Sequence, residues 1–437
     1  MNLAVKKGKP GQSLILGVFA GGLASLAIAY GLGWTSPVIR SDGLGHYLYL
    51  PAAFIDRDLS LQTTVDRSFH GRPPDWAGVN RVPGSDRLLL KFPIGEAVML
   101  APFFLAADLL TLATRWAPPT DFAAPYQTAV AVGGVTYLAL GLWWLGRLLS
   151  DQFPAPVVRW TLLVLLFGTN LFHYGTYDNV FSHVYSFAAV AGCLLAVVRW
   201  YAAPGWKTTV CLGGLGGLVT IIRPTNTVLL LCAVLYGIWD TAGLRDRWRF
   251  WLTHWRFVAL GALVYAGVVS VQLAYWKFVT GHWVVYAYEA QEVFHFDNPQ
   301  LLNVLFSVRK GLFFWAPVLL LAAGGFFTIA RSAPAWRLPA AVVLPANLYI
   351  IASWHDWAYG GSFGHRAFVE SLPLFAIGYA GLLQKARESG RHRPLVVCSV
   401  VLASVTTLLM IKYWIHVLPY DRTTWPQLWT ALTRWRI

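Results

Sequence analysis

Charged residues are scarce in this chain. Asp, Glu, Lys and Arg together make up 12% of its 437 residues, about half the share found in soluble domains. Hydrophobic residues account for 57%, and the mean hydropathy is +0.52. This composition excludes an ordinary soluble protein and predicts an all-α polytopic membrane protein.

Cysteine is also rare. The four cysteines lie inside apolar runs and show no metal-ligand spacing, at Cys193, Cys211, Cys232 and Cys398. This pattern excludes a disulfide framework and a cysteine zinc site, so we interpret these residues as packing residues.

Acidic residues are fewer than basic ones, 20 against 34, which gives a net charge of +14. The basic residues are scattered through the loops between apolar runs rather than gathered in one soluble domain, which argues against nucleic acid as a partner. We attribute much of this charge to membrane topology and some of it to phosphate binding. The 22 Trp and 19 Tyr residues crowd near segment ends, as membrane anchors do.

Long apolar runs are abundant and predict a single transmembrane domain over residues 1–437, with a first extracytoplasmic loop at 34–92 and a short tail at 417–437. The first run follows a basic cluster, as in a secretory signal, but it is long enough to span and lacks a convincing cleavage site, so we expect an uncleaved helix. Eleven crossings are expected, near residues 13–33, 126–146, 160–174, 184–200, 208–222, 225–239, 257–279, 312–330, 339–353, 367–384 and 394–416.

The Lys and Arg residues of the short loops all fall on one side if the amino terminus is cytoplasmic. This arrangement requires the apolar segment 94–114 to return to the side that it entered from. Pro93 and Pro102 favour such a re-entrant or interfacial hairpin. If the segment crossed outright, Arg147, Arg159 and the basic cluster around Arg245 would lie outside.

Unusual polar residues gather in the loops that this topology leaves on the outer face. Acids, bases and histidines converging on one membrane face predict an active site that opens to the outside. The group comprises Asp42, Asp56, Asp58, Lys91, Glu96, Asp178, His183, Arg223, Glu289, Glu292, His295, Asp297, Arg309, Lys310, His355, Asp356, His365 and Arg366.

Asp42 is the most informative of these residues, because it places a carboxylate just beyond the first apolar run. A carboxylate at a membrane surface is costly unless it is paired or works on a substrate. We interpret Asp42 as a catalytic base. The alternative is an N-cap for a helix that starts near Leu44.

Several short motifs resemble a known class. Residues 42–51 and 91–95, with 168–174, 182–187 and 357–366, are similar to the GT-C class of integral-membrane glycosyltransferases and to a bacterial branch of it. This broad family includes protein O-mannosyltransferases and aminoarabinose transferases. The resemblance covers much of the transmembrane core, but each motif is only moderately specific.

The resemblance implies a helical membrane module whose long first outer loop carries the catalytic carboxylate, here Asp42. It implies a sugar donor carried on a polyprenyl phosphate, inverting transfer, and a bacterial inner-membrane location with the active site facing outside or the periplasm. The acceptor is left open among glycan, lipid and protein, as are the sugar and the lipid length.

Transfer from a lipid phosphate needs a base for the acceptor proton and cations for the departing phosphate. Lys and Arg normally favour the loops on the cytoplasmic side of a membrane. Lys and Arg residues on the outer face therefore need another explanation. Arg309 and Lys310 open a helix, and His365 and Arg366 end a glycine-rich loop whose small residues also suit a tight connection. Lys91 matches a basic residue of aminoarabinose-transferase relatives, and snorkelling explains it almost as well.

Metal dependence is left open. Many relatives carry a second acid after the Gly168–Thr169 region, whereas this chain has Asp178 and His183 there, and Glu96 is a further candidate to support the site or bind a divalent metal. The Asp56–Asp58 pair forms a weak D-x-D match that interfacial solvation explains better. The acidic loop at 289–297 is better interpreted as a solvated loop, and Arg223 as a cap of a hairpin turn between two apolar runs.

A transporter or flippase of a lipid-linked or anionic solute is the main alternative, because it would also be polytopic with ionisable groups along its path. The polar residues cluster on one face rather than at mid-membrane, and no repeat relates two halves of the sequence. We therefore favour the glycosyltransferase.

Overall fold

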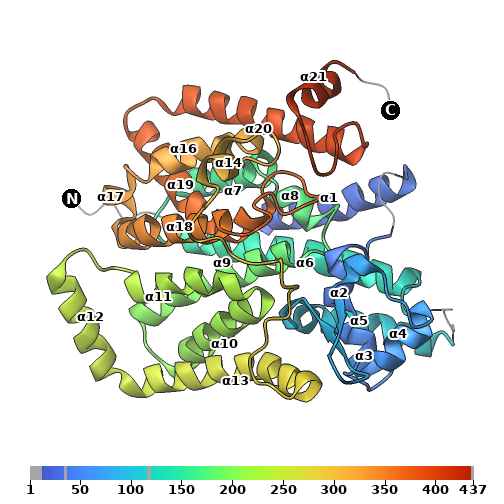
Figure 1. The fold of residues 1–437 in the computed structure, drawn as a ribbon. Helices are drawn as coiled ribbons and strands as arrows, with labels where there is room; N and C mark the ends of the chain where they lie inside the picture. Colours follow the sequence, from blue (N-terminus) through green and yellow to red (C-terminus); the bar gives the residue numbers. More distant parts are fainter. Residues whose placement is uncertain (1–11, 34–36, 116–119, 435–437) are drawn as a thin grey trace.

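The computed structural model describes residues 12–33, 37–115 and 120–434, and helices dominate this part of the chain (Figure 1). Eight of the described helical segments are long and apolar enough to cross a membrane, which confirms the predicted all-α polytopic fold. They are α1 (Gln12–Gly31), α5 (Gly95–Ala113), α6 (Ala124–Ser150), α9 (Ser182–Ala202), α13 (Trp255–Thr280), η3 (Pro334–Trp336) with α18 (Arg337–Ala352), η4 (Arg366–Ser371) with α19 (Leu372–Glu388), and α20 (His392–Trp414).

The other expected crossings are shorter or interrupted helices. Pro317 separates two of them, because proline lacks the N–H that an unbroken helix needs. These segments are α7 (Ala155–Gly168), α10 (Trp206–Ile222), η2 (Pro224–Leu230) with α11 (Leu231–Leu235), α15 (Leu312–Trp315), α16 (Val318–Gly325) and α17 (Ile329–Ser332).

Short elements fill the connections. In the first loop, β1 pairs with β2 in an antiparallel hairpin, with Val79 opposite Leu90 and Arg81 opposite Leu88. The short elements are α2 (Asp42–Tyr47), α3 (Tyr49–Phe54), α4 (Gln62–Phe69), η1 (Asp75–Ala77), β1 (Val79–Arg81), β2 (Leu88–Leu90), α8 (Leu171–Gly175), α12 (Thr241–Thr253), α14 (Leu301–Phe306) and α21 (Trp425–Thr433).

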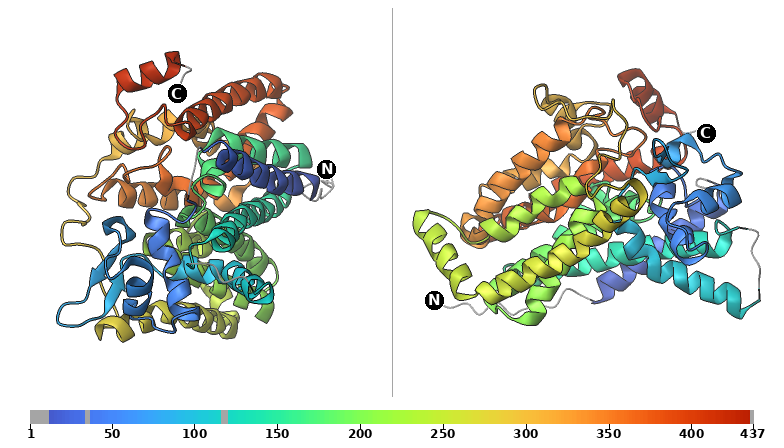
Figure 2. Two further views of the ribbon diagram at one scale, coloured as in Figure 1. Left: turned by 90° about the vertical axis from the view of Figure 1, so that its right-hand side faces the viewer. Right: turned by 60° about the horizontal axis from the view of Figure 1, so that its bottom comes forward.

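The bundle has two distinct ends. Helices α2 to α5 gather at one of them, here called the first-loop end, and α12 lies at the opposite α12 end (Figures 1 and 2). Helix α9 begins at the first-loop end, where Val180 packs on Gly43, and finishes at the α12 end, where Tyr201 packs on Phe250. Helix α10 runs back, and α13 ends at the first-loop end with Tyr275 bound to the backbone of β2.

The segment expected to form a hairpin at 94–114 is one uninterrupted helix, α5, with Pro102 inside it. By length and composition it qualifies as a span. Its start, Gly95, packs on the carboxyl end of α10 at Ile222, and Asp108 near its other end accepts a hydrogen bond from Tyr126 at the start of α6. Both ends of α5 contact elements of the first-loop end. The segment is a single helix rather than the expected hairpin, and its return to the side of entry stays a prediction.

A single missing hydrogen bond at Pro102 does not break α5, because an apolar environment offers the backbone no better partner than the helix itself. The basic cluster at Lys6–Lys9 lies outside the described residues.

Candidate active site

A cavity of about 420 Å³ opens at the first-loop end, within the size range of small-molecule sites. Aromatic and apolar side chains such as Trp276, Tyr288 and Phe294 form part of its wall. Its ionisable lining residues come from the first loop, the ends of α9 and α10, and two later loops. They are Asp42, His46, Lys91, His183, Arg223, Glu292, His355, Asp356 and Arg366.

Asp42 is the first residue of α2 and lines the cavity. The N-cap is Ser41, whose side chain makes no capping bond, so Asp42 does not have the capping role considered as its alternative. Its carboxylate instead accepts a hydrogen bond from Arg366 Nη2 at 2.9 Å. Burial raises the pKa of Asp42, but Arg366, with His46 and Lys91, outweighs this effect and holds that pKa below its ordinary value.

Arg366 follows the glycine-rich loop 360–365 and begins η4. Its guanidinium lies over the ring of Phe181, 5.3 Å from the centroid, and its Nε is buried without a hydrogen-bond partner among the described residues. Gly360 and Gly364 have φ angles of +61° and +60°, so the loop needs glycine for its tight path.

Lys91 lines the cavity as expected and forms an ion pair with Glu292. Its ammonium also lies over the ring of Tyr288, 5.1 Å from the centroid. These contacts join the first loop to the segment between α13 and α14. Glu292 is therefore an ion-pair partner at the cavity wall, rather than part of a fully solvated loop.

His183 lines the cavity at the start of α9, and its Nδ1 lies 2.9 Å from Glu370 Oε1. Arg223 Nε lies 3.3 Å from the same oxygen. From the sequence we interpreted Arg223 as a cap. Glu370 was not among the residues predicted for the site. The available signal for Glu370 was its position four residues after Arg366 on one helical segment.

Glu96 is fully buried near the cavity but does not line it. Neither carboxyl oxygen has a hydrogen-bond partner within the described ranges, and Oε2 lies 3.5 Å from His46 Nδ1. Glu96 therefore lies beside His46 of α2, and its assignment as a supporting residue or metal ligand stays a prediction.

Three expected phosphate contacts lie outside the cavity lining. Arg309 pairs with Asp421 at 3.0 Å, and the ammonium of Lys310 is buried and donates to the backbone carbonyls of Ser362 and Tyr420. His365 is buried among aromatic rings. The geometry corrects their assignment: Arg309 binds the carboxyl-terminal segment, Lys310 joins that segment to the glycine-rich loop, and His365 packs on the rings of Tyr359 and Phe368.

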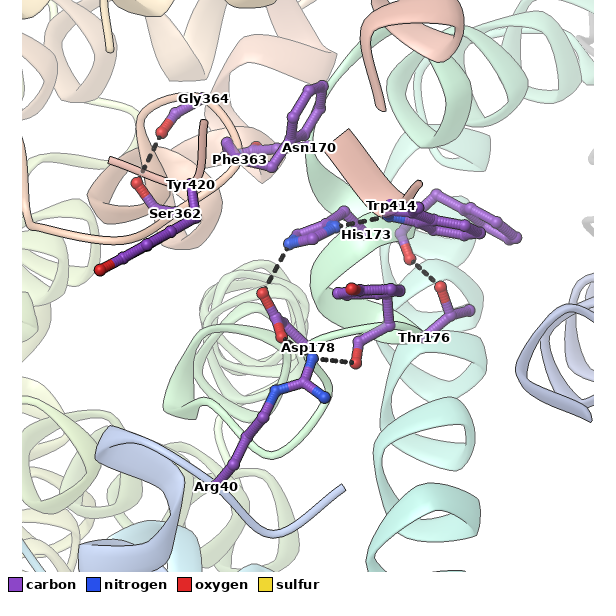
Figure 3. Close-up of polar contacts among 12 residues, drawn as sticks. Arg40, Asn170, His173, Thr176, Asp178, Ser362, Phe363, Gly364, Trp414 and Tyr420 are labelled. Carbon is purple, nitrogen blue, oxygen red and sulfur yellow. Dashed lines mark hydrogen bonds and ion pairs between the residues drawn. The ribbon is translucent and has the colours of Figure 1, made fainter. Parts of the chain in front are cut away.

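Asp178 also lies outside the cavity lining and belongs to a separate buried network (Figure 3). Its carboxylate binds Arg40 Nη2 at 2.5 Å and His173 Nε2 at 2.8 Å, and Trp414 donates to the other nitrogen of His173. Burial raises the pKa of Asp178, but Arg40 and His173 lower it well below its ordinary value. Asp178 is therefore held as a charged structural anchor.

Within the described residues, no three His, Cys, Asp or Glu side chains gather in a way that suits a metal ion. The acids of the D-x-D match have separate protein partners: Asp56 binds Arg67, and Asp58 binds the backbone and hydroxyl of Thr63. Neither carboxylate lines the cavity.

No family model matches the chain, and no curated protein matches it. Among solved structures, the chain is similar to ArnT from Cupriavidus metallidurans in the apo state, with a TM-score of 0.46 and 13% sequence identity. The similarity covers 85% of this chain and 62% of that one, so the chain spans less than two thirds of that protein's length.

Proposed function

We propose that the protein is a GT-C-type glycosyltransferase that moves a sugar from a polyprenyl-phosphate donor to an acceptor at the extracytoplasmic face. The observation that carries this proposal is the carboxylate of Asp42, 2.9 Å from the partly buried Arg366, in the wall of a cavity that combines three cations with apolar surface. This combination suits a donor with a charged phosphate and a hydrocarbon tail.

In the proposed reaction, Asp42 accepts the proton of the acceptor hydroxyl while that oxygen attacks the anomeric carbon of the sugar. The bond between the anomeric carbon and the phosphate oxygen breaks, and the polyprenyl phosphate leaves with both electrons. Arg366, Lys91 and Arg223 stabilise the charge that develops on the phosphate. A single direct displacement inverts the anomeric configuration.

The distribution of basic residues supports an outward-facing cavity. Helix α12, with Arg245 and Arg249, lies at the end of the bundle opposite the cavity, and Arg199 lies at the α12 end of α9. Because Lys and Arg in short loops favour the cytoplasmic side, this asymmetry supports a cavity that opens on the other side of the membrane.

The test is sugar transfer by purified protein in nanodiscs, with a panel of radiolabelled polyprenyl-phosphate sugars and a crude envelope extract as acceptor. We expect Asp42→Asn to lower the rate by about 10²- to 10⁴-fold, as the loss of a general base does. Asp86→Asn is the matched control, because the Asp86 side chain is fully exposed on the same loop and should leave the rate unchanged.

Full activity in a folded Asp42→Asn variant would show that Asp42 is not the catalytic base. No transfer by the wild type from any donor would favour the transporter or flippase.

A further inference from the structure

Each cation of the cavity lining is already bound to a carboxylate. Arg366 is paired with Asp42, Lys91 with Glu292, and Arg223 with Glu370. A phosphate that enters the cavity must therefore share or replace one of these carboxylates. Leaving a displaced charge buried and unpaired would be strongly unfavourable. The acid that is displaced must consequently be one that water can reach.

Asp42 meets this condition best. Its side chain is 31% exposed, whereas that of Glu370 is 1% exposed and also holds His183. Glu292 is 16% exposed and also accepts a hydrogen bond from the backbone N–H of Glu289, so its release would break two contacts. Of the three pairs, that of Asp42 with Arg366 separates at the lowest cost.

Arg366 is also the cation best prepared for a phosphate. Its side chain is only 13% exposed and rests on the ring of Phe181, so the guanidinium stays in place when its partner leaves. Its Nε is buried without a hydrogen-bond partner in the described part of the chain, next to the Nη2 that binds Asp42. A guanidinium binds phosphate through two such parallel N–H groups, and here one of the two is unused.

We propose that the donor phosphate replaces Asp42 on Arg366 and that this exchange frees the base only when the donor is bound. The inference rests on the proposed function, since it names how that site is regulated by its own substrate. Without a donor, Arg366 holds the carboxylate of Asp42. With a donor, the phosphate binds Nε and Nη2, and the carboxylate becomes available to the acceptor hydroxyl. Binding is therefore ordered, with the donor first.

The test measures the reactivity of Asp42 toward a water-soluble carbodiimide and an amine, read by peptide mass spectrometry on the full chain in nanodiscs. The probes are polyprenyl monophosphate without a sugar and polyprenol of the same length. We expect the monophosphate to increase labelling of Asp42 several-fold, and polyprenol to leave it unchanged. An unchanged or lower labelling of Asp42 with the monophosphate would overturn the proposal.

Two further readouts sharpen the test. In Arg366→Gln, which removes the positive charge, Asp42 should be labelled strongly without lipid, and the monophosphate should add little. Labelling of Glu292 is followed in the same digests, and an increase there instead of at Asp42 would assign the exchange to Lys91 and refute the proposal.

Carbodiimide labelling can be measured without sugar transfer. The exchange at Arg366 and the glycosyltransferase activity can therefore be refuted independently. If transfer depends on Asp42 but the labelling of Asp42 does not change with lipid, only the proposed exchange at Arg366 is refuted. If lipid increases the labelling of Asp42 but no donor supports sugar transfer, only the proposed glycosyltransferase activity is refuted.

Discussion

The ionisation of Asp42 is controlled by two opposing influences, burial and the guanidinium of Arg366. In the free protein the positive neighbours prevail, and the pKa of Asp42 lies below its ordinary value. If a phosphate takes Arg366, the nearest charge becomes negative and burial is no longer offset, so the pKa of Asp42 rises. Asp42 can act as a base only when it is deprotonated. If its pKa is higher, acidification protonates it, and activity is lost, at a higher pH.

This change in pKa can be measured from pH profiles of the transfer rate. The profile of kcat/KM for the donor reports the free enzyme, and that of kcat reports the donor complex. We expect the acidic limb of kcat to lie at a higher pH than the acidic limb of kcat/KM. Coincident limbs would contradict the exchange at Arg366. Asp86→Asn, in which no cavity residue changes, should reproduce both wild-type limbs.

The outer-face group predicted from the sequence contains eight of the nine ionisable residues named in the cavity lining and lacks His46, because each of the eight is a costly polar group in a loop of that face. Site roles were predicted for four of them, Asp42, Lys91, His183 and Arg366. These four were not separated from Arg309 and Lys310, which share that location. The position of a residue in the sequence predicts the membrane face on which its side chain lies. It does not predict whether that side chain points into the cavity. The adjacent Arg309 and Lys310 bind a carboxylate and two backbone carbonyls, and neither reaches the cavity.

At the scale of elements, the network of Asp178 joins three segments that are distant in the sequence. Arg40 lies two residues before Asp42, His173 belongs to α8, and Trp414 ends α20 (Figure 3). The ion pair holds the approach to α2 against the turn that precedes α9. Because the pKa of Asp178 is lowered in the folded state, its contribution to stability is present above its unfolded pKa and is lost as the pH falls through the folded pKa.

Helices α16 and α19 cross at a contact that only glycine allows. A Cβ placed on Gly325 would lie 1.9 Å from the carbonyl oxygen of Gly378, far inside van der Waals contact, whereas a Cβ on the neighbouring Gly324 would meet no atom within 4 Å. We therefore expect Gly325→Ala to destabilise the protein by about 1–3 kcal/mol, the usual cost of overpacking, or more because backbone must move.

Thermal unfolding in detergent measures this difference, with Gly324→Ala as the matched control in the same helix. The control should unfold at the wild-type temperature or slightly above it, because alanine favours a helix over glycine. Equal unfolding temperatures for the two variants would show that the helices do not cross at Gly325.

Helix α5 shows which part of an element a sequence can predict. The preference of Lys and Arg for cytoplasmic loops predicted that the segment 94–114 returns to its own side, and this stays a prediction. Gly95 and Asp108 both contact elements of the first-loop end. The shape was not predictable in the same way. Proline was expected to turn the chain, but whether Pro102 breaks a helix depends on the packing around it, which the local sequence does not contain.

At the scale of the whole molecule, the cavity and the basic helix α12 lie at opposite ends of the bundle. The cavity lies at the first-loop end, and basic residues such as Arg147 at the end of α6 and Arg245 on α12 mark the other end. From this asymmetry we predict that the α12 end faces the cytoplasm and that the cavity faces the other side of the membrane. The three cations of the cavity lining each have a carboxylate partner.

The orientation and the course of α5 can be tested together with single cysteines in a background that lacks the four native ones. Asp86→Cys and Thr120→Cys flank α5 at exposed positions, and Arg245→Cys lies on α12. With a membrane-impermeant maleimide on intact spheroplasts, we expect labelling at positions 86 and 120, and labelling at 245 only after permeabilisation. Labelling of 86 but not 120 would mean that α5 crosses the membrane, and labelling of 245 alone would reverse the orientation. Either result would place part of the Lys and Arg loops outside, against the charge asymmetry from which the outward-facing cavity is inferred.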